Sequence, residues 1–341
     1  MNNMNTEFKV CIRCMTYNQS RFILETLNGF VMQETDFPYV IMVTDDASTD
    51  GAQQVIRNYI KENFDTDCTD TAYVEETPYA EIEFARHKTN SNCYIVAHYL
   101  KTNHYQLEKD KLPYLAEWRS KSTYEAFCEG DDYWIDPLKL QKQVSYMDMH
   151  PECGLSYTEA VIVNENPAKK VRRWTKGVTD NFCAHLMIKG NPVVTASVCL
   201  RRELVDEYLR EKATFGFIMK MGDVPLWIYA AKDHPVHHMD DKTVAYRVLA
   251  NSASHSPDPQ KIRAFYQNSL DIKLYMNRRY NIGVSEKKMW RGFYKGVLQT
   301  MCGFSRKHMW EAIKEVSVKS PLAFFDLKVM YYLMKRCFLN R

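Results

Sequence analysis

Two groups of acidic side chains lie where carboxylates could bind a divalent cation. Asp45 and Asp46 directly follow an apolar run, and Glu129, Asp131 and Asp132 surround a single glycine after another. Three adjacent acids repel one another, and a fold accepts this most readily when a cation compensates the charge. Mg²⁺ and Mn²⁺ bind carboxylate oxygens and often share a substrate phosphate as a ligand. The pattern favours a metal-bound diphosphate, although Asp45 and Asp46 alone are equally typical of a turn that caps a helix.

A βαβ unit near the N-terminus would position the first of these groups. Residues 8–15 and 39–43 are predicted strands because both runs are mostly apolar, and residues 22–31 show the spacing of an amphipathic helix. Strands joined by a helix in this way are parallel and buried on both faces. Ligands of an open parallel sheet bind at the carboxyl ends of its strands. Both acidic groups are therefore expected at that edge.

The other predicted elements continue the alternation of an α/β protein. Residues 62–83 carry eight acidic residues and no basic one, which predicts a surface excursion, and residues 90–121 are predicted to be partly helical. A loop rich in Ser and Pro, 251–259, separates a predicted domain over 1–256 from a helical region over 257–341. Further strands are predicted at 82–86, 124–128, 193–200 and 243–248, and further helices at 55–60, 138–147 and 224–231.

Composition and motifs exclude several classes of protein. The net charge is only +3 and no basic stripe is interleaved with aromatic residues, so nucleic acid is not an expected partner. The sequence has no Gly-x-x-x-x-Gly-Lys and no Gly-x-Gly-x-x-Gly, so phosphates would be held through a metal and not by a glycine-rich loop. No apolar run reaches the roughly 18 residues of a transmembrane helix, and the first residues lack the pattern of a secretory signal. A cytoplasmic location is expected.

Three segments, taken in order, resemble the family 2 glycosyltransferases. They are 16–18 (Thr-Tyr-Asn) after the first strand, 43–50 (Val-Thr-Asp-Asp-Ala-Ser-Thr-Asp) after the second, and 129–134 (Glu-Gly-Asp-Asp-Tyr-Trp) after a later one. Segments 128–143 and 246–255 are similar to the branch of that family found in bacterial capsule and O-antigen polysaccharide clusters. An ordered set of motifs is far more specific than any one of them.

The resemblance covers roughly residues 8–256 and implies an α/β fold of the GT-A type, the fold of nucleotide-diphospho-sugar transferases. Such a fold has a Rossmann-like, mostly parallel sheet flanked by helices, here with a helical C-terminal extension. It implies inverting transfer with Mn²⁺ or Mg²⁺ as cofactor, with Asp132 as chief metal ligand and Asp131 near the ribose and the metal. Glu129 and Gly130 stand where Asp and Ser are common, and the longer carboxylate places Glu129 further outward in the metal site.

The nucleotide sugar would be held by residues at the strand ends and in a late loop. The resemblance implies that Asp46 faces the uracil or another base, and that Arg247, Ser252 and His255 close over the diphosphate. A polar linker is the alternative interpretation of those three residues, and Arg86 either contacts phosphate or caps its strand. The full set implied for the nucleotide sugar is Thr16, Tyr17, Asn18, Asp45, Asp46, Ser48, Arg86, Asp131, Arg247, Ser252 and His255.

An inverting transfer also needs a base that removes the proton of the acceptor hydroxyl while the metal stabilises the leaving diphosphate. The family places this base at the start of a helix. Residues 222–227, Gly-Asp-Val-Pro-Leu-Trp, match best and imply that Asp223 is the base. Without the resemblance, Asp223 would be interpreted as the cap of the helix that Pro225 opens.

A histidine-rich segment, 234–241, superficially suggests a second metal site. Its sequence is His-Pro-Val-His-His-Met-Asp-Asp, and it is predicted to be a strand that leads to Arg247. Adjacent residues of a strand point to opposite faces, so His237 and His238 diverge. No second metal site is predicted there.

The C-terminal segment concentrates the basic excess of the chain. Residues 305–341 contain eight Lys or Arg and three Asp or Glu. As a helix, residues 321–339 would gather Lys328, Lys335 and Arg336 within about 100° of the helical wheel. Two interpretations fit equally well: a helix at the cytoplasmic face of the inner membrane, or a helix packed on the catalytic domain with its lysine stems along the rim.

These expectations describe a metal-dependent inverting glycosyltransferase of the hexosyl or N-acetylhexosaminyl type, which uses a UDP-sugar and a surface-polysaccharide or lipid-linked glycan acceptor. There are two alternatives. A sugar nucleotidyltransferase would need a Gly-rich loop with Arg and Lys after the first strand, and residues 16–20 are not such a loop. A glycan-binding protein on a decayed transferase fold would not need the acids Asp46, Asp131, Asp132 and Asp223.

Overall fold

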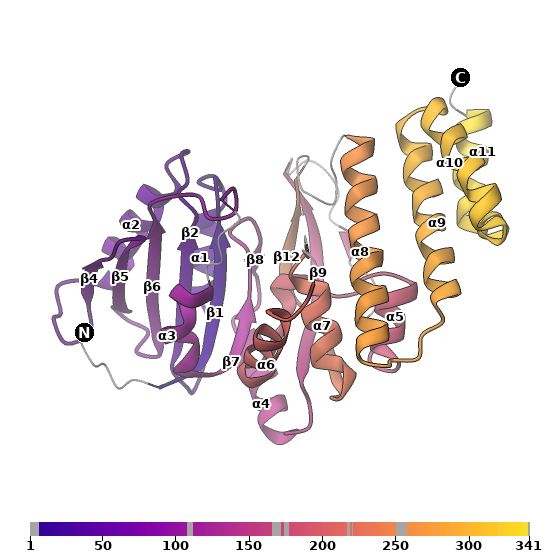
Figure 1. The fold of residues 1–341 in the computed structure, drawn as a ribbon. Coiled ribbons are helices and arrows are strands. Elements are labelled where there is room, and N and C mark those ends of the chain that lie inside the picture. The colour runs from indigo at the N-terminus through magenta and orange to yellow at the C-terminus, as the bar shows by residue number, and fades with distance from the viewer. Residues whose placement is uncertain are drawn as a thin grey trace. The chain divides into compact units, whose positions relative to one another are not determined.

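The computed structural model describes residues 7–107, 112–165, 172–173, 177–216, 219, 221–249 and 258–339. Its described strands are β1 (Phe8–Thr16), β2 (Tyr39–Asp45), β3 (Phe64–Asp65), β4 (Tyr73–Glu76), β5 (Ala80–His87), β6 (Cys93–Leu100), β7 (Ser122–Phe127), β8 (Tyr133–Trp134), β9 (Leu155–Asn164), β10 (Arg172–Arg173), β11 (Cys199–Arg201) and β12 (Val236–Val248). They form one 12-stranded sheet in the order β3-β5-β6-β2-β1-β7-β11-β9-β12-β8, with β4 beside β5 and β10 beside β9 (Figure 1).

A parallel core of β6, β2, β1 and β7 lies within this sheet. β1 pairs in parallel with β2 and β7, and β2 pairs in parallel with β6. The flanking strands are antiparallel, with β5 against β6 and β11 against β7. Thr16 lies beside Asp45, and Asp45 lies beside Tyr99, so the carboxyl ends of three adjacent strands meet at one edge. The predicted α/β fold class is confirmed.

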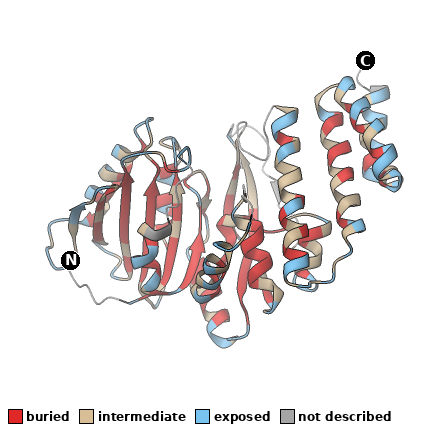
Figure 2. Cartoon of the chain, viewed as in Figure 1, coloured by how far each residue is buried: buried red, intermediate tan, exposed pale blue. Residues whose placement is uncertain are grey.

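Helices cover both faces of the sheet. α1, α2 and α4 share a buried core with one face of β1 and β2, and α3 packs on the other face through Leu115 and Trp118. Figure 2 shows the central strands buried along most of their length. The α-helices are α1 (Ile23–Val31), α2 (Ala52–Asn63), α3 (Leu112–Ser120), α4 (Lys139–Met149), α5 (Phe182–Ile188), α6 (Arg202–Lys212), α7 (Asp223–Lys232), α8 (Pro259–Arg279), α9 (Glu286–Phe304), α10 (Arg306–Lys319) and α11 (Leu327–Met334), with 3₁₀ turns η1 (Thr195–Ser197) and η3 (Pro321–Phe325) and the π turn η4 (Lys335–Leu339).

Contacts divide the chain into two compact units. The sheet unit comprises Met1–Thr179, Pro192–Ala213 and His234–Arg247, and the remaining segments form the helical unit: Asp180–Asn191, Thr214–Asp233 and Val248–Arg341. The predicted boundary at residue 256 does not coincide with this division, because α5 and α7 join the later helices. As a boundary between independently folding domains, residue 256 stays a prediction.

The C-terminal segment is not the single helix that its periodicity predicts. Asp326 separates η3 from α11, and its carboxylate accepts hydrogen bonds from the N–H groups of Lys328 and Val329 at 3.1 and 3.3 Å. Ala323 and Val329 are fully buried in a core shared with α9 and α10, so the segment packs on neighbouring helices of the helical unit. Packing on the catalytic domain and contact with a membrane both stay predictions. Across the part of the chain that the structure describes, no helix is long and apolar enough to cross a membrane.

The structure corrects one local expectation and adds detail to two others. In the region 90–121, which is predicted to be partly helical, residues 112–120 form α3, while residues 93–100 form the buried central strand β6. Their unbroken run of mostly apolar residues is typical of a strand buried on both faces. The expected strand at 193–200 is mostly irregular, with η1 followed by the short β11. The excursion at 62–83 contains the short edge strands β3 and β4 and the start of β5.

Candidate functional site

The loops that follow β1 and β2 are bound to each other. The backbone N–H of Asn18 donates to Ser48 Oγ at 2.8 Å, and Asn18 Oδ1 accepts from the N–H of Thr49 at 2.8 Å. Asn18 and Ala47 adopt positive φ angles of 53° and 59°, which are uncommon outside glycine and persist where the surroundings enforce them. The two loops therefore form one fixed rim at the carboxyl edge of the sheet.

Asp45 and Asp46 both hold neighbouring backbone. Asp45 is fully buried, and it accepts from the N–H of Ser48 at 2.9 Å and from the Gln53 side chain at 2.8 Å. The two carboxylate oxygens of Asp46 accept from the backbone N–H groups of residues 104 and 105 at 2.8 and 3.1 Å. Asp45 thus shapes the turn, as one of the two interpretations expects. The implied role of Asp46 against a base stays a prediction.

The acidic loop, residues 129–132, is attached to the end of β1. The N–H of Gly130 donates to the carbonyl of Met15 at 3.1 Å. A Cβ at Gly130 would lie 2.6 Å from Thr16 Oγ1 and 2.7 Å from Gln19 Oε1, distances too short for any side chain. This close approach explains the glycine among the acids and places Thr16 against the acidic loop.

β12 brings Arg247 to the other side of the acidic loop. The N–H of Arg247 donates to Asp132 Oδ1 at 2.7 Å, and its guanidinium donates to the carbonyl of Asp131 at 2.9 Å. The guanidinium also pairs with Glu25 and lies 4.4 Å from the ring centroid of Phe22. Arg247 is therefore a buried support of the acidic loop in this structure. Its implied contact with a diphosphate stays a prediction.

Burial raises the pKa values of two acids in this loop, and repulsion by neighbouring carboxylates adds to the effect at Asp132. Asp132 is 2% exposed; burial, and then the charge of Asp131, raise its pKa well above that of an ordinary aspartate, while the hydrogen bond from Arg247 acts in the opposite direction. Burial also raises the pKa of Asp131, whereas Glu129 is exposed. A divalent cation would offset both the desolvation and the repulsion. The charges of Asp132 and Asp131 are therefore compatible with a bound divalent cation, and the identity of the ion stays a prediction.

Thr26 is a site residue that the sequence analysis missed. Its buried hydroxyl lies 2.6 Å from the carbonyl oxygen of Asp132 and 3.1 Å from that of Gly130. It stands on the buried stripe of α1, between Ile23 and Phe30. A hydroxyl at an apolar position of an amphipathic helix needs a buried partner, and that was the signal available in the sequence.

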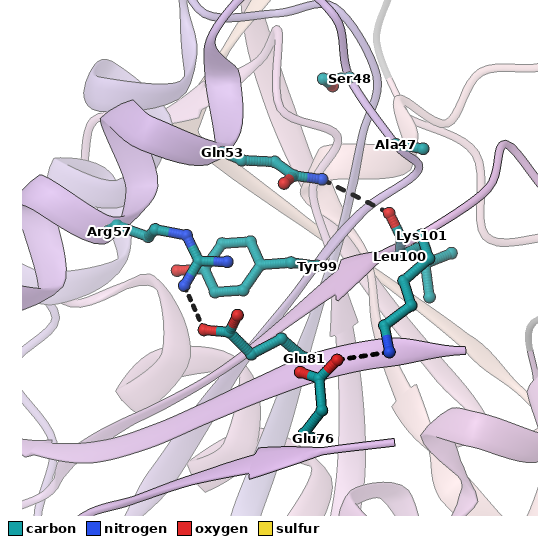
Figure 3. A pocket seen from close by; sticks show the side chains of 9 residues that line it. All are labelled: Ala47, Ser48, Gln53, Arg57, Glu76, Glu81, Tyr99, Leu100 and Lys101. Carbon is teal, nitrogen blue, oxygen red and sulfur yellow. Dashed lines mark hydrogen bonds and ion pairs between the residues drawn. The ribbon is translucent and has the colours of Figure 1, made fainter. Parts of the chain in front are cut away.

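A cavity of about 450 Å³ opens beside Ser48, at the carboxyl ends of β2 and β6 (Figure 3). The charged side chains that line the cavity form ion pairs: Arg57 pairs with Glu81, and Lys101 pairs with Glu76. The Arg57 guanidinium also lies 3.7 Å from the ring centroid of Tyr99. Because each cation already faces a carboxylate, the cavity offers no excess positive charge for a diphosphate. The charges that line this cavity therefore give no support to a diphosphate site here.

The structure does not bring Arg86 to the carboxyl edge of the sheet, where Asp45 lies. Arg86 pairs with Tyr94 at the start of β6, whereas Asp45 pairs with Tyr99 near its end. Five residues along a strand correspond to about 17 Å. Arg86 instead donates from Nε to the carbonyl of Ser91 at 3.1 Å, so the interpretation as a local strand contact is the one that the geometry supports.

The remaining predicted residues fall into three groups. Tyr17 is exposed at the rim next to Asn18. Ser252 and His255 lie outside the described residues. Asp223 belongs to the helical unit, where it is the first residue of α7 and is partly buried.

Comparisons with known proteins agree with the fold. Residues 12–70, which carry β1, α1, β2 and α2, match the model of the glycosyl transferase family 2. Uncharacterized proteins of Mycobacterium bovis and Mycobacterium tuberculosis are 28% identical over 235 residues, which cover 66% of this chain and 59% of theirs. The chain thus spans less than two thirds of the length of these relatives.

Two solved structures are also similar. S. aureus TarS superimposes with a TM-score of 0.52 at 17% identity, over 96% of this chain and 48% of that one. A Pyrobaculum calidifontis mannosyltransferase, solved with GDP-Man and Mn²⁺, gives 0.48 at 13% identity over 98% and 89%. Residues 12–70 thus resemble the glycosyl transferase family 2, and the similarity to TarS shows a shared fold. The resemblance to the capsule and O-antigen branch stays a prediction.

Proposed function

We propose that this protein is a metal-dependent inverting glycosyltransferase. It transfers a hexosyl or N-acetylhexosaminyl group from a nucleotide-diphosphate sugar, a UDP-sugar in the first instance, to a hydroxyl of a surface-polysaccharide or lipid-linked glycan. The observation that carries this proposal is the meeting of Thr16, the Asp45–Asp46 turn and the acidic loop at the carboxyl edge of adjacent parallel strands. That edge is the ligand-binding edge of open α/β sheets.

The residues divide the work of the reaction between them. Asp132 and Asp131 hold the metal, which when bound neutralises charge on the leaving diphosphate. Thr16 and Asp46 line the nucleoside pocket. Asp223 accepts the proton of the acceptor hydroxyl, so leaving-group and acceptor activation depend on different parts of the chain.

Thermal unfolding with a panel of nucleotide sugars and Mn²⁺ tests this function. A UDP-sugar that binds the folded state should raise the unfolding midpoint, more strongly with Mn²⁺ than without it, and the same sugar should be slowly hydrolysed. Release of pyrophosphate from a nucleoside triphosphate and a sugar phosphate would instead indicate a nucleotidyltransferase. Glycan binding without any donor binding or hydrolysis would indicate a decayed transferase fold.

We further propose that the C-terminal segment contacts the inner membrane surface as a peripheral element. Phe325 and Leu327 are 75% and 84% exposed, and the same segment carries Lys328, Lys335 and Arg336. Exposed apolar and basic side chains together favour an anionic lipid interface. The other exposed apolar residues of the segment are Leu322, Met330, Tyr331 and Met334.

Sedimentation with lipid vesicles tests the membrane proposal. Because Ala323 and Val329 are buried, truncation would expose core, and paired substitutions Phe325→Ser and Leu327→Ser are the cleaner change. We expect wild-type protein to sediment with vesicles containing phosphatidylglycerol, and the double variant to lose most of this association. Val74→Ser, at a 66% exposed position of β4, is the control and should behave as wild type. Equal sedimentation of all three proteins would contradict the proposal.

A further inference from the structure

A second group of metal-binding side chains lies on β9 and β12, among residues outside the acidic loop. One potential ligand atom each from Glu159, His238 and Asp240 lies within 4.8 Å of the others. His238 and Asp240 are two residues apart on β12, which places their side chains on the same face of the strand, and Glu159 comes from the neighbouring strand β9. The adjacent residue His237 points to the opposite face of β12, where its ring stacks on Tyr146 with ring centroids 3.4 Å apart.

His238 has an imidazole nitrogen that the described protein does not use. The side chain is 10% exposed and its Nδ1 lies 3.5 Å from Asp240 Oδ1. Its Nε2 is buried and has no hydrogen-bond partner among the described residues. Gly177 covers the ring so closely that a Cβ there would lie 2.0 Å from Cδ2. A buried unsatisfied nitrogen is rare in native proteins, and an unseen water or ion is one explanation for it.

The donor set selects the class of ion. Glu159 brings a buried carboxylate, 1% exposed, to the group, while Asp240 is exposed. One imidazole nitrogen with two carboxylate oxygens suits Zn²⁺ and similar first-row ions, whereas Mg²⁺ prefers oxygen ligands alone. Ligand atoms on a tetrahedral Zn²⁺ ion are about 3.4 Å apart, a spacing that small side-chain rotations of the exposed Asp240 can approach.

We propose that Glu159, His238 and Asp240 form a binding site for Zn²⁺ or a similar first-row divalent cation. This site uses none of the acids of the acidic loop. The bound ion would join β9 to β12. Nine residues after His238, β12 also carries Arg247, whose N–H donates to Asp132. The role of the ion is therefore to fix the strand that supports the acidic loop, and the three protein ligands leave coordination positions for water.

Titration of the full chain with Co²⁺ tests this site by absorption spectroscopy. The visible bands of bound Co²⁺ report nitrogen and oxygen ligands, and intense near-ultraviolet bands would reveal binding to any of the ten cysteines instead. We expect wild-type protein and the matched control His237→Gln to bind one Co²⁺ ion with nitrogen and oxygen ligands. His238→Ala and Asp240→Asn should bind it at least about tenfold more weakly.

Two further measurements keep the result decisive. Asp132→Asn should retain the Co²⁺ spectrum, which separates this site from the metal proposed to act on the donor and makes its outcome independent of transferase activity. Asp240 is exposed, so Asp240→Asn should fold even where His238→Ala does not. Equal Co²⁺ affinity in the wild type and in Asp240→Asn would overturn the proposal, as would a thiolate-type spectrum of the bound ion.

Discussion

Replacing Asp132 with asparagine is expected to remove most of the sugar-transfer activity and to weaken the binding of Mn²⁺. The amide keeps the shape of the side chain and an oxygen that can accept the 2.7 Å bond from the N–H of Arg247, so the acidic loop should stay in place. The charge that a hard divalent cation requires is lost. We expect a decrease in kcat/KM of roughly 10²-fold or more, measured as donor hydrolysis against Mn²⁺ concentration.

The same substitution should stabilise the metal-free protein at neutral pH. Burial and Asp131 raise the pKa of Asp132 in the folded chain, so the folded state holds this proton more tightly than the unfolded state does. The contribution of Asp132 to stability is then most favourable below the ordinary aspartate pKa of about 4, and it is lost as the pH rises through the raised pKa. Asparagine has no such charge. The unfolding midpoint of Asp132→Asn without metal should therefore exceed that of the wild type near pH 7.

Asp136 offers a matched control for this experiment. It lies four residues beyond Asp132, where Oδ1 accepts from the N–H of Leu138 and Oδ2 pairs with Lys142. Asp136→Asn removes the same charge from the same stretch of chain, yet it should retain both activity and metal binding. Wild-type turnover by Asp132→Asn, with an unchanged requirement for Mn²⁺, would show that Asp132 is not the chief metal ligand.

The sheet edge was predictable because its signals are local. The apolar runs at 8–15 and 39–43 each end in polar residues, and parallel strands must end on the same side. The structure confirms that Thr16 and Asp45 lie side by side. The place of the acidic loop followed from the same reasoning, since β7 pairs in parallel with β1.

Other parts of the site depend on contacts between distant segments. The position of Gly130 against Thr16 and Gln19 follows from the register between β7 and β1, which composition does not encode. The bond from the N–H of Arg247 to Asp132 joins residues 115 positions apart. Arg86 was misplaced because β5 runs antiparallel to β6, so its carboxyl end lies at the opposite edge from Asp45. A sequence pattern that gives strands without their directions cannot distinguish these edges.

Replacing Asp223 with asparagine is expected to slow sugar transfer by about 10²–10⁴-fold, the usual worth of a general base, without weakening donor or metal binding. The N-cap position of α7 is Gly222, and Asp223 is the first residue of the helix. The capping interpretation therefore does not describe its position. Transfer to the true acceptor, measured beside donor affinity from thermal unfolding, separates the two steps.

The charge of Asp223 acts on a nearby buried lysine. Burial lowers the pKa of Lys273, on α8, to about 8, while the charge of Asp223 acts in the opposite direction. The two side chains thus interact within the helical unit.

A purely structural role of Asp223 predicts a different outcome. An acid in the first turn of a helix contributes about 0.3–1 kcal/mol through the helix dipole, so its loss would slightly lower the unfolding midpoint and leave the rate of transfer almost unchanged. Asp233→Asn is the matched control, because Asp233 lies at the exposed carboxyl end of the same helix, and it should transfer sugar at the wild-type rate. Near-normal transfer by Asp223→Asn with the true acceptor would exclude Asp223 as the base and direct attention to another carboxylate or to a group of the substrate itself.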